Sequence, residues 1–255
     1  MPGLGPVSAL TVIKIGGGVV VAQDALWQVV RARAGGTVLV HGGGPQATAM
    51  ARRLGHDPVI VQGRRVTSDL DLDIVRWTMR GEINLSLVAG ARRHGLPAVG
   101  ISGADGATLQ VTRRPPWEID GQTVDFGWVG DVQGVDPSLL QTLISSGYLP
   151  VVAPIGIDAE GQVYNVNADT VSVAIAGALA ATELLLVTET GGLLDDAGKP
   201  VERCDRTLFQ AGLDQGWIQG GMRVKVQLAL EALEAGVSRV RIVGPGLTGG
   251  TVVQT

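Results

Sequence analysis

The sequence predicts an α/β protein built on a mostly parallel sheet with helices on both faces. Short apolar runs rich in β-branched residues recur along the chain, and stretches of helical length and periodicity separate them. Several of these runs end directly in glycines, as buried parallel strands do where they turn into a following helix. Strands and helices that alternate in this way are typical of βαβ units, which build parallel sheets covered on both sides.

The apolar runs and helical periods give an expected order of elements. Strands are expected over residues 10–15, 37–41, 59–61, 97–101, 149–153, 183–188 and 238–243. Helices are expected over residues 22–34, 45–54, 70–94, 137–145, 168–181, 208–215 and 222–235. Gly35-Gly36 suits the end of the first helix, and Pro45 suits the first turn of the second. Residues 108–132 contain Pro115-Pro116 and short β-like pieces, which predict a hairpin excursion.

Composition limits the class of protein. The chain has 255 residues, 45% of them hydrophobic and 17% charged, which predicts a sizeable core without disorder. A formal charge of −4 and a pI near 5.4 argue against a nucleic-acid binder, since no excess of cations is available to displace counterions. No internal repeat is visible, and we expect any boundary between two lobes near residues 154–163.

The same composition indicates a cytoplasmic protein. Cys204 is the single cysteine, so no intrachain disulfide can form, which fits a reducing compartment. Residues 1–10 lack the basic region of a signal peptide. The longest apolar run, residues 171–187, is interrupted by polar residues and is shorter than the ~20 residues of a membrane span.

Two glycine-rich turns follow expected parallel strands. They are Lys14-Ile15-Gly16-Gly17-Gly18 and His41-Gly42-Gly43-Gly44-Pro45. Ligands of open α/β sheets bind at this edge, and the second turn begins a helix, whose free N–H groups favour an anion such as phosphate or carboxylate. Tight turns without a ligand are the plain alternative. No P-loop motif occurs, and the dinucleotide pattern at Gly42, Gly44 and Ala47 lacks its later acidic residue.

Further polar residues stand in unusual positions. Gly63-Arg64-Arg65 places arginines in an expected loop, where a guanidinium can grip a carboxylate with two hydrogen bonds, although many arginines are simply solvated. The segment 164–170 carries two Asn and an Asp before an apolar helix, whereas N-capping needs only one of them. Lys14 ends an apolar strand, where a charge is costly unless paired, and Lys225 lies in the first turn of a helix, against its dipole.

The histidines and tryptophans give less information about function. His41, His56 and His94 are scattered, and with one cysteine they make no metal-ligand cluster in the sequence. We expect His41 to be a hydrogen-bonded core residue. Four of the tryptophans, Trp77 among them, are expected to be packing residues.

The combination of these segments resembles the amino-acid kinase family, and most of all its acetylglutamate kinase branch. The resemblance runs in family order from about residue 11 to 243 and is specific only as a set. The segments that carry it are Lys14-Ile15-Gly16-Gly17, His41-Gly42-Gly43-Gly44-Pro45, Gly63-Arg64-Arg65-Val66-Thr67, Ala98-Val99-Gly100-Ile101-Ser102-Gly103-Ala104-Asp105-Gly106, Tyr164-Asn165-Val166-Asn167-Ala168-Asp169 and Gly220-Gly221-Met222 with Lys225.

The resemblance implies a fold and an activity. The expected fold is a three-layer α/β/α sandwich with a mostly parallel central sheet. Residues 1–155 form an N-terminal lobe that binds the amino acid and dimerises, and residues 156–255 form a lobe that binds ATP. The expected reaction is transfer of a phosphoryl group from ATP, with Mg²⁺ carried on the nucleotide and no metal site on the protein. Its acceptor is the side-chain carboxylate of N-acetyl-L-glutamate, in arginine biosynthesis, and a homodimer is expected.

The resemblance also assigns roles by position. The residues at the transferring phosphoryl group are Lys14, Lys225, Gly17 and Asp169, with Asp169 holding both lysines. The residues that hold the acidic substrate are Gly43 and Gly44 at the reacting carboxylate, Arg65 at the α-carboxylate and Asn165 at the α-substituent. The residues that border the nucleotide are Thr188, Gly191, Gly192 and Gly221.

Such a site agrees with the chemistry of a carboxylate nucleophile. The carboxylate is already ionised at neutral pH, so the reaction needs no general base. Phosphoryl transfer instead needs in-line positioning and neutralisation of charge on the equatorial oxygens. Lysines, glycine N–H groups and a magnesium ion supply both.

Departures from the family pattern leave other functions open. Asn84 is followed by Leu85 where the family commonly has lysine, and the segment after Val243 is short. Relatives inhibited by arginine carry an additional N-terminal helix and a longer C-terminal signature, so we expect no inhibition by arginine. One alternative is a kinase for aminoadipate or glutamate attached to an acidic carrier protein, in lysine biosynthesis. Another is a relative that binds ligand without catalysis.

Overall fold

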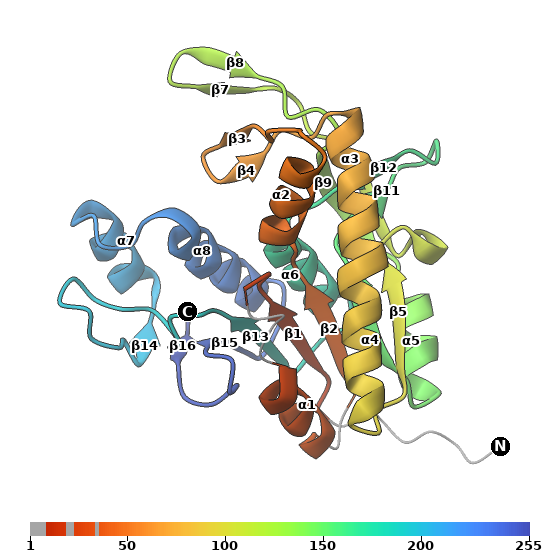
Figure 1. The fold of residues 1–255 in the computed structure, drawn as a ribbon. Helices are drawn as coiled ribbons and strands as arrows, with labels where there is room; N and C mark the ends of the chain where they lie inside the picture. The colour runs from red at the N-terminus through yellow and green to blue at the C-terminus, as the bar shows by residue number, and fades with distance from the viewer. Residues whose placement is uncertain (1–8, 19–22, 34–35) are drawn as a thin grey trace.

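An eight-stranded sheet forms the centre of the computed structural model, which describes residues 9–18, 23–33 and 36–255. Its strand order is β14-β16-β15-β13-β1-β2-β10-β5 (Figure 1). The strands are β1 Thr11–Ile15, β2 Thr37–His41, β5 Ala98–Ser102, β10 Leu149–Ala153, β13 Glu183–Val187, β14 Arg203–Cys204, β15 Arg239–Val243 and β16 Thr251–Val253. All neighbours are parallel except β15 and β16. The expectation of a mostly parallel sheet is confirmed.

Helices cover both faces of this sheet. They are α1 Gln23–Ala32, α2 Gly44–Arg53, α3 Asp69–Val75, α4 Asn84–Arg93, α5 Ser138–Ser145, α6 Ala168–Ala178, α7 Arg206–Asp214 and α8 Gly220–Glu234, with a 3₁₀ turn η3 over Asp105–Ala107. Successive strand residues point to opposite faces. Val12 of β1 accordingly packs in one buried cluster with residues of α6 and α8, and Ile13 packs in another with residues of α1 and α4. The three-layer α/β/α sandwich is confirmed.

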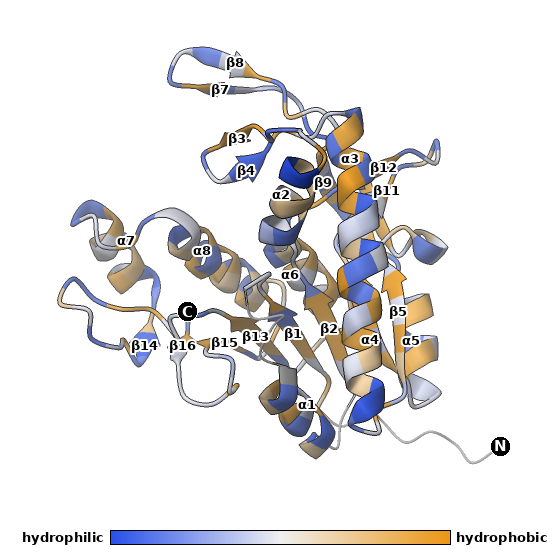
Figure 2. Cartoon of the chain, in the orientation of Figure 1, coloured by the Kyte–Doolittle hydropathy of each residue, from blue (hydrophilic) through white to orange (hydrophobic). Residues whose placement is uncertain are grey.

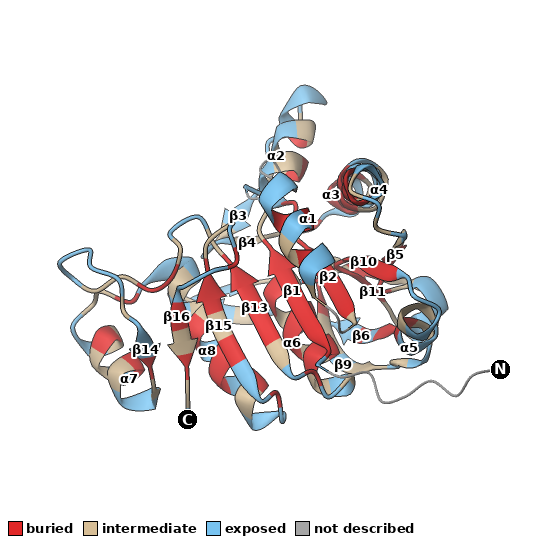
Figure 3. Ribbon diagram, turned by 90° about the horizontal axis from the view of Figure 1, so that it is seen from below, coloured by how far each residue is buried: buried red, intermediate tan, exposed pale blue. Residues whose placement is uncertain are grey.

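Burial explains why the sequence shows the strands so clearly. Every residue of β1, β2 and β10 is buried, and the strands appear as an almost continuous buried layer in Figure 3. Apolar residues concentrate in the same layer in Figure 2, whereas the helices carry polar residues on their outer sides. Strands buried on both faces give continuous apolar runs without alternation.

A smaller sheet and two hairpins lie at the end of the molecule toward which β1 and β2 run. The smaller sheet has the order β12-β11-β6-β9, and the hairpins are β3–β4 and β7–β8 (Figure 1). These strands are β3 Ile60–Val61, β4 Arg64–Arg65, β6 Leu109–Arg113, β7 Trp117–Ile119, β8 Gln122–Val124, β9 Gly130–Val135, β11 Ile155–Ile157 and β12 Val163–Asn165. The expected hairpin excursion is confirmed, and it extends into a four-stranded sheet.

The long helix expected over residues 70–94 contains a π-helical segment. Arg76–Ile83, labelled η2, joins α3 to α4 without a break. It carries Met79 and Ile83 onto the glycine turn after β2, where a Cβ atom on Gly43 would lie 2.5 Å from Ile83 Cδ1 and 3.2 Å from Met79 Cγ. π-helical segments often occur at functional sites.

Other features differ from expectation or stay untested. The short strands β14 and β16 were not expected, and Trp77 is 53% exposed, so its expected packing role is wrong. Gly35, in the expected end of the first helix, lies outside the described residues. The division into lobes at residues 1–155 and 156–255 stays a prediction, and the central sheet contains strands from both segments. Across the described residues, no helix combines the length and apolarity that a membrane crossing requires.

Candidate active site

Lys14 is a buried cation at the penultimate position of β1. It shares the face of Val12, so its side chain points to the side of the sheet that α6 and α8 cover. The residue is 5% exposed, and its Nζ lies 2.8 Å from Asp169 Oδ1. An isolated charge would be costly there, and the ion pair with Asp169 compensates it.

Asp169 lies in the first turn of α6 and connects two lysines. Its second oxygen, Oδ2, accepts a hydrogen bond of 3.0 Å from Lys225 Nζ on α8. The N-cap is Asn167, whose Oδ1 accepts hydrogen bonds from the N–H groups of Asp169 and Thr170. Of the three polar residues noted in the sequence, Asn167 therefore caps the helix, and the side chain of Asp169 remains available to bind both lysines.

The two lysines keep Asp169 ionised. Burial by itself raises the pKa of this carboxyl, but the charges of Lys14 and Lys225 outweigh burial and hold the pKa below its ordinary value. Burial lowers the pKa of Lys14, with Asp169 opposing and Lys225 adding to that effect. Two cations share one carboxylate, so the cluster retains a positive charge that suits a phosphate group.

The two glycine turns lie side by side above this cluster. Strands β1 and β2 are parallel neighbours with Ile15 opposite His41, so their carboxyl ends meet at one edge. The N–H of Gly42 donates to the carbonyl oxygen of Ile15 at 2.8 Å. Gly43 is the N-cap of α2, whose first turn presents free N–H groups toward the edge. This arrangement suits an anion between the two turns.

Gln46 joins one turn to the other. Its Nε2 donates a hydrogen bond of 2.7 Å to the carbonyl oxygen of Gly17. The approach is so close that a Cβ atom on Gly17 would lie 2.8 Å from Gln46 Oε1 and 2.8 Å from Pro45 Cδ. Glycine is therefore required at position 17, and the first turn of α2 fixes the position of its peptide group.

His41 and Asn84 support the second turn from below. The fully buried His41 bonds through Nδ1 to the carbonyl oxygen of Gly42 at 2.9 Å and through Nε2 to Asn84 Nδ2 at 3.1 Å. Asn84 also donates to the carbonyl oxygens of Ile101 and Val151. Burial is the main reason that the pKa of His41 falls to about 4. His41 is thus a neutral, hydrogen-bonded core residue, as expected.

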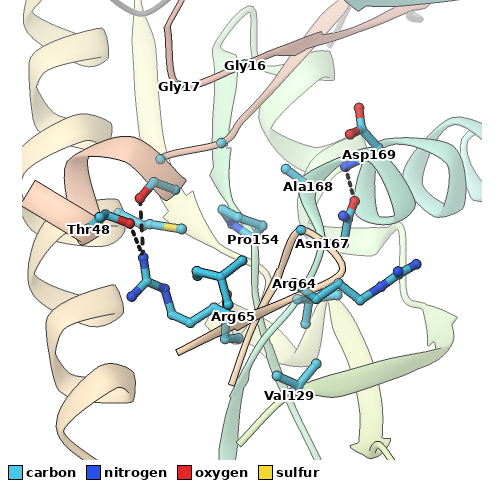
Figure 4. A pocket seen from close by; sticks show the side chains of 18 of the residues that line it. Gly16, Gly17, Thr48, Arg64, Arg65, Val129, Pro154, Asn167, Ala168 and Asp169 are labelled. Carbon is cyan, nitrogen blue, oxygen red and sulfur yellow. Dashed lines mark hydrogen bonds between the residues drawn. The ribbon is translucent and has the colours of Figure 1, made fainter. Parts of the chain in front are cut away.

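A cavity of about 360 Å³ opens in front of the two turns. Lys14 and Asp169, both buried, form its inner end, and the lining also includes Gly43, Gly44, Arg65 and Asn165. Figure 4 shows Arg65 and Asp169 at separate positions around it. The Nη2 of Arg65 donates to Thr48 Oγ1 at 2.7 Å. Asn165 lines the cavity while donating to Thr67 Oγ1 at 3.1 Å.

The structure thus gathers most of the predicted site residues and leaves others apart. Lys14, Gly17, Asp169 and the four predicted substrate-binding residues line this one cavity, and Lys225 reaches it through Asp169. The residues predicted to border the nucleotide do not line it. Gly191 and Gly192 line a separate cavity beside β15, and Gly221 lies at the start of α8. The N–H of Thr188 donates to the carbonyl oxygen of Val243 at the ends of β13 and β15.

Several residues of the site carried no expected role. Gln46, Thr48 and Arg114 each line the cavity or hold its loops. Gln46 follows a motif that was noted, so its position in the first helical turn was available as a signal. Arg114 comes from the smaller sheet, whose pairing of β6 with β9 no local pattern reveals.

Comparison with known proteins shows the family of this chain. The model of the amino acid kinase family matches residues 9–244. The chain is 41% identical over 230 residues to a protein named acetylglutamate kinase from Methanopyrus kandleri, a match that covers 89% of this chain and 92% of that protein. It is 40% identical over 244 residues to the acetylglutamate kinase of Anaeromyxobacter dehalogenans, covering 91% and 90%.

Solved structures share the fold. The protein smu.665 from Streptococcus mutans UA159 superposes with a TM-score of 0.81 at 26% identity, over 96% of this chain and 98% of that one. An N-acetylglutamate synthase from Neisseria gonorrhoeae has a TM-score of 0.81 at 23% identity, over 97% of this chain and 59% of that one, and shows likeness of fold alone. By the extent of the family match and the identity to its relatives, this chain belongs to the amino acid kinase family.

Proposed function

We propose that this chain is an acetylglutamate kinase, which transfers the γ-phosphoryl group of ATP to the side-chain carboxylate of N-acetyl-L-glutamate in arginine biosynthesis. The observation that carries the proposal is the Lys14–Asp169–Lys225 cluster at the inner end of a cavity walled by two glycine turns. Relatives that match along nearly their whole length bear this name.

The geometry suggests how each group contributes. The reacting carboxylate would lie against the N–H groups of Gly43 and Gly44, so that one of its oxygens attacks the γ-phosphorus as the bond to ADP breaks. Lys14 and Lys225 would neutralise the charge on the transferring group, and Asp169 fixes both ammonium groups. Gly17, held by Gln46, would donate its N–H to the same group. Positioning and charge supply the acceleration, since an ionised nucleophile needs no base.

The nucleotide would approach from the side of α8. We infer that Thr188, Gly191, Gly192 and Gly221 border it, as the family resemblance implies. Both oxygens of Asp169 already face lysines, and among the described residues no three His, Cys, Asp or Glu side chains gather as a metal site. We therefore expect the phosphate oxygens of ATP to hold the Mg²⁺, which neutralises charge on the nucleotide.

The test is an ADP-release screen with purified protein and several acceptors. N-acetyl-L-glutamate is the expected substrate, and aspartate, glutamate and carrier-linked aminoadipate or glutamate are the comparisons. Trapping with hydroxylamine identifies the product, because an acyl phosphate yields a hydroxamate. ADP release together with hydroxamate only in the presence of N-acetyl-L-glutamate would support the proposal.

The other outcomes point elsewhere. Faster turnover of a carrier-linked substrate would favour the carrier-protein kinase. ATP binding without turnover on any acceptor would indicate a relative that only binds ligand.

We also propose that the protein forms a homodimer. Leu70, Trp77 and Leu85 are exposed along the continuous helix from α3 through η2 to α4, and a partner subunit could cover them. Mass measurement by light scattering is expected to give twice the chain mass, and Trp77→Glu is expected to give a folded monomer. A monomeric wild-type protein would exclude this interface.

A further inference from the structure

The two arginines of the β3–β4 hairpin have different surroundings. Arg65 has three polar contacts: its guanidinium lies 3.2 Å from Asp71 Oδ1 and donates to Thr48 Oγ1 and to the carbonyl oxygen of Gly44. Its side chain is 7% exposed, and Asp71 neutralises its charge. Arg65 can therefore orient a ligand through its N–H groups, but its positive charge is already balanced by Asp71.

Arg64 lines the same cavity with a different set of contacts. Its side chain leaves β4 away from Thr48, whereas Arg65 points toward it (Figure 4). The guanidinium carbon lies 4.9 Å from the ring centroid of Trp117 on β7. Among the residues with described positions, no carboxylate lies within the 4.0 Å of an ion pair with Arg64.

A second guanidinium stands on the same ring. Arg114 lies 4.6 Å from the centroid of Trp117, but it donates to Asp131 Oδ1 through Nε and Nη2. Burial lowers the pKa of Arg64, and the nearby charge of Arg114 lowers it further, with Asp131 opposing. The fold thus keeps Arg64, which has no carboxylate within ion-pair distance among the described residues, beside a second cation in the lining of the cavity.

The charges around the cavity match a substrate with two carboxylates. Lys14 and Lys225 share Asp169, which leaves one positive charge at the inner end. Arg65 and Arg114 each have a carboxylate of their own. Arg64 is the second unmatched charge among the residues that line the cavity. A guanidinium attracted to the face of an indole makes no hydrogen bond with the ring, so its N–H groups can still bind a carboxylate.

We propose that Arg64, held over the ring of Trp117, is a specificity-determining residue that selects acceptors with a free α-carboxylate besides the carboxylate that is phosphorylated. The ligand class is an N-acylated acidic amino acid with both carboxylates ionised. The inference rests on the proposed function and deepens it. It assigns the charge that selects the substrate to Arg64 and the orientation of the substrate to Arg65.

The experiment pairs a variant with a modified substrate. Wild-type protein and Arg64→Ala are assayed with N-acetyl-L-glutamate and with its α-carboxamide, which keeps the side-chain carboxylate. Wild type is expected to prefer the dicarboxylate by about 10- to 100-fold in kcat/KM, as for a charged hydrogen bond. Arg64→Ala is expected to lose that preference while acting on the amide as well as wild type does. Arg64→Lys, which keeps the charge without the planar fork, is expected to retain part of it.

Arg113→Ala is the matched control. Arg113 is the last residue of β6, directly before Arg114, and pairs with Asp125 at 2.9 Å. Its half-exposed side chain lies outside the cavity, so its removal deletes the same charge without touching the site. Its preference for the dicarboxylate is expected to equal that of wild type.

Other results overturn the inference. An equal loss of Arg64→Ala on both substrates would mean a structural role, and an unchanged preference would assign the α-carboxylate to Arg65 alone. In both cases the proposed function stands. A defect of Arg64→Ala confined to carrier-linked substrate would place the anion on a carrier protein. No activity of wild type on either small substrate would remove the proposed function and this inference with it.

Discussion

The ammonium group of Lys14, at the end of β1, lies 2.8 Å from the carboxylate of Asp169, at the start of α6. Lys225 holds the other oxygen of that carboxylate, so either lysine can be removed without leaving Asp169 unpaired. We therefore expect Lys14→Ala and Lys225→Ala to fold. Each is expected to reduce kcat by about 10²- to 10³-fold, the usual cost of one preorganised donor. ADP release measures the loss, and near-normal turnover in either variant would contradict the assigned roles.

Asp169→Asn is expected to behave differently from the lysine variants. It leaves two ammonium groups facing each other in a buried position, so it should lower stability as well as activity. Breaking a buried ion pair by removing one partner costs roughly 3–5 kcal/mol. Thermal unfolding is expected to show a lower Tm for Asp169→Asn than for Lys225→Ala. Equal Tm values would mean that the carboxylate is not needed to hold the lysines.

Gln46 is expected to act as a positioning residue for phosphoryl transfer. Its backbone belongs to the turn that would hold the carboxylate, and its side chain holds Gly17 of the other turn. Gln46→Ala should let the two turns separate slightly, and small misplacements of reacting groups cost up to ~10²-fold in rate. We expect kcat to fall by about tenfold or more while the KM values change little. A purely structural role would instead lower Tm and leave kcat per folded molecule unchanged.

The strands were predictable from the sequence because they are buried on both faces. Continuous apolar runs such as residues 37–41 then leave no other interpretation. The ion-pair cluster was less accessible: Lys14 could be recognised as a costly buried charge, but the identity of its partner depends on how α6 and α8 pack on the sheet. Arg114 gave no signal, because β6 and β9 meet only through long-range pairing.

The edge of the central sheet was also missed for a physical reason. Strand β14 has two residues and β16 has three, too short for either to show a period. The π-helical segment η2 is likewise invisible as a pattern, since its polar and apolar residues fit an ordinary helix until the contact with Gly43 is known.

Gly43→Ala is expected to weaken binding of the acidic substrate. A Cβ atom at this position would lie 2.5 Å from Ile83 Cδ1 and push the turn away from η2. We expect KM for N-acetyl-L-glutamate to rise by about tenfold, equivalent to about 1.4 kcal/mol. Gly81→Ala is the control, because a Cβ on this glycine of η2 meets nothing within 4 Å. A similar KM in both variants would show that the contact does not position the turn.

His41 is expected to make stability depend on pH below neutrality. Its pKa is about 4 in the folded protein and 6.5 in the unfolded chain, so the unfolded chain binds more protons between these values. The free energy of unfolding therefore falls as the pH drops through 6.5 toward 4, whereas above 6.5 the imidazole is neutral in both states and has no effect.

His41→Gln isolates this contribution, because glutamine can hydrogen-bond without titrating. Other groups with lowered pKa values, such as Asp71 and Asp169, also make the protein less stable in acid, but wild type and His41→Gln both contain them. Urea unfolding at about pH 7 and about pH 4.5 should show that wild type loses about 2–3 kcal/mol more than His41→Gln between the two conditions. Equal losses of stability in the two proteins would mean that His41 is protonated in the folded protein. The hydrogen bond from Asn84 Nδ2 opposes protonation, because it needs an unprotonated Nε2 on His41.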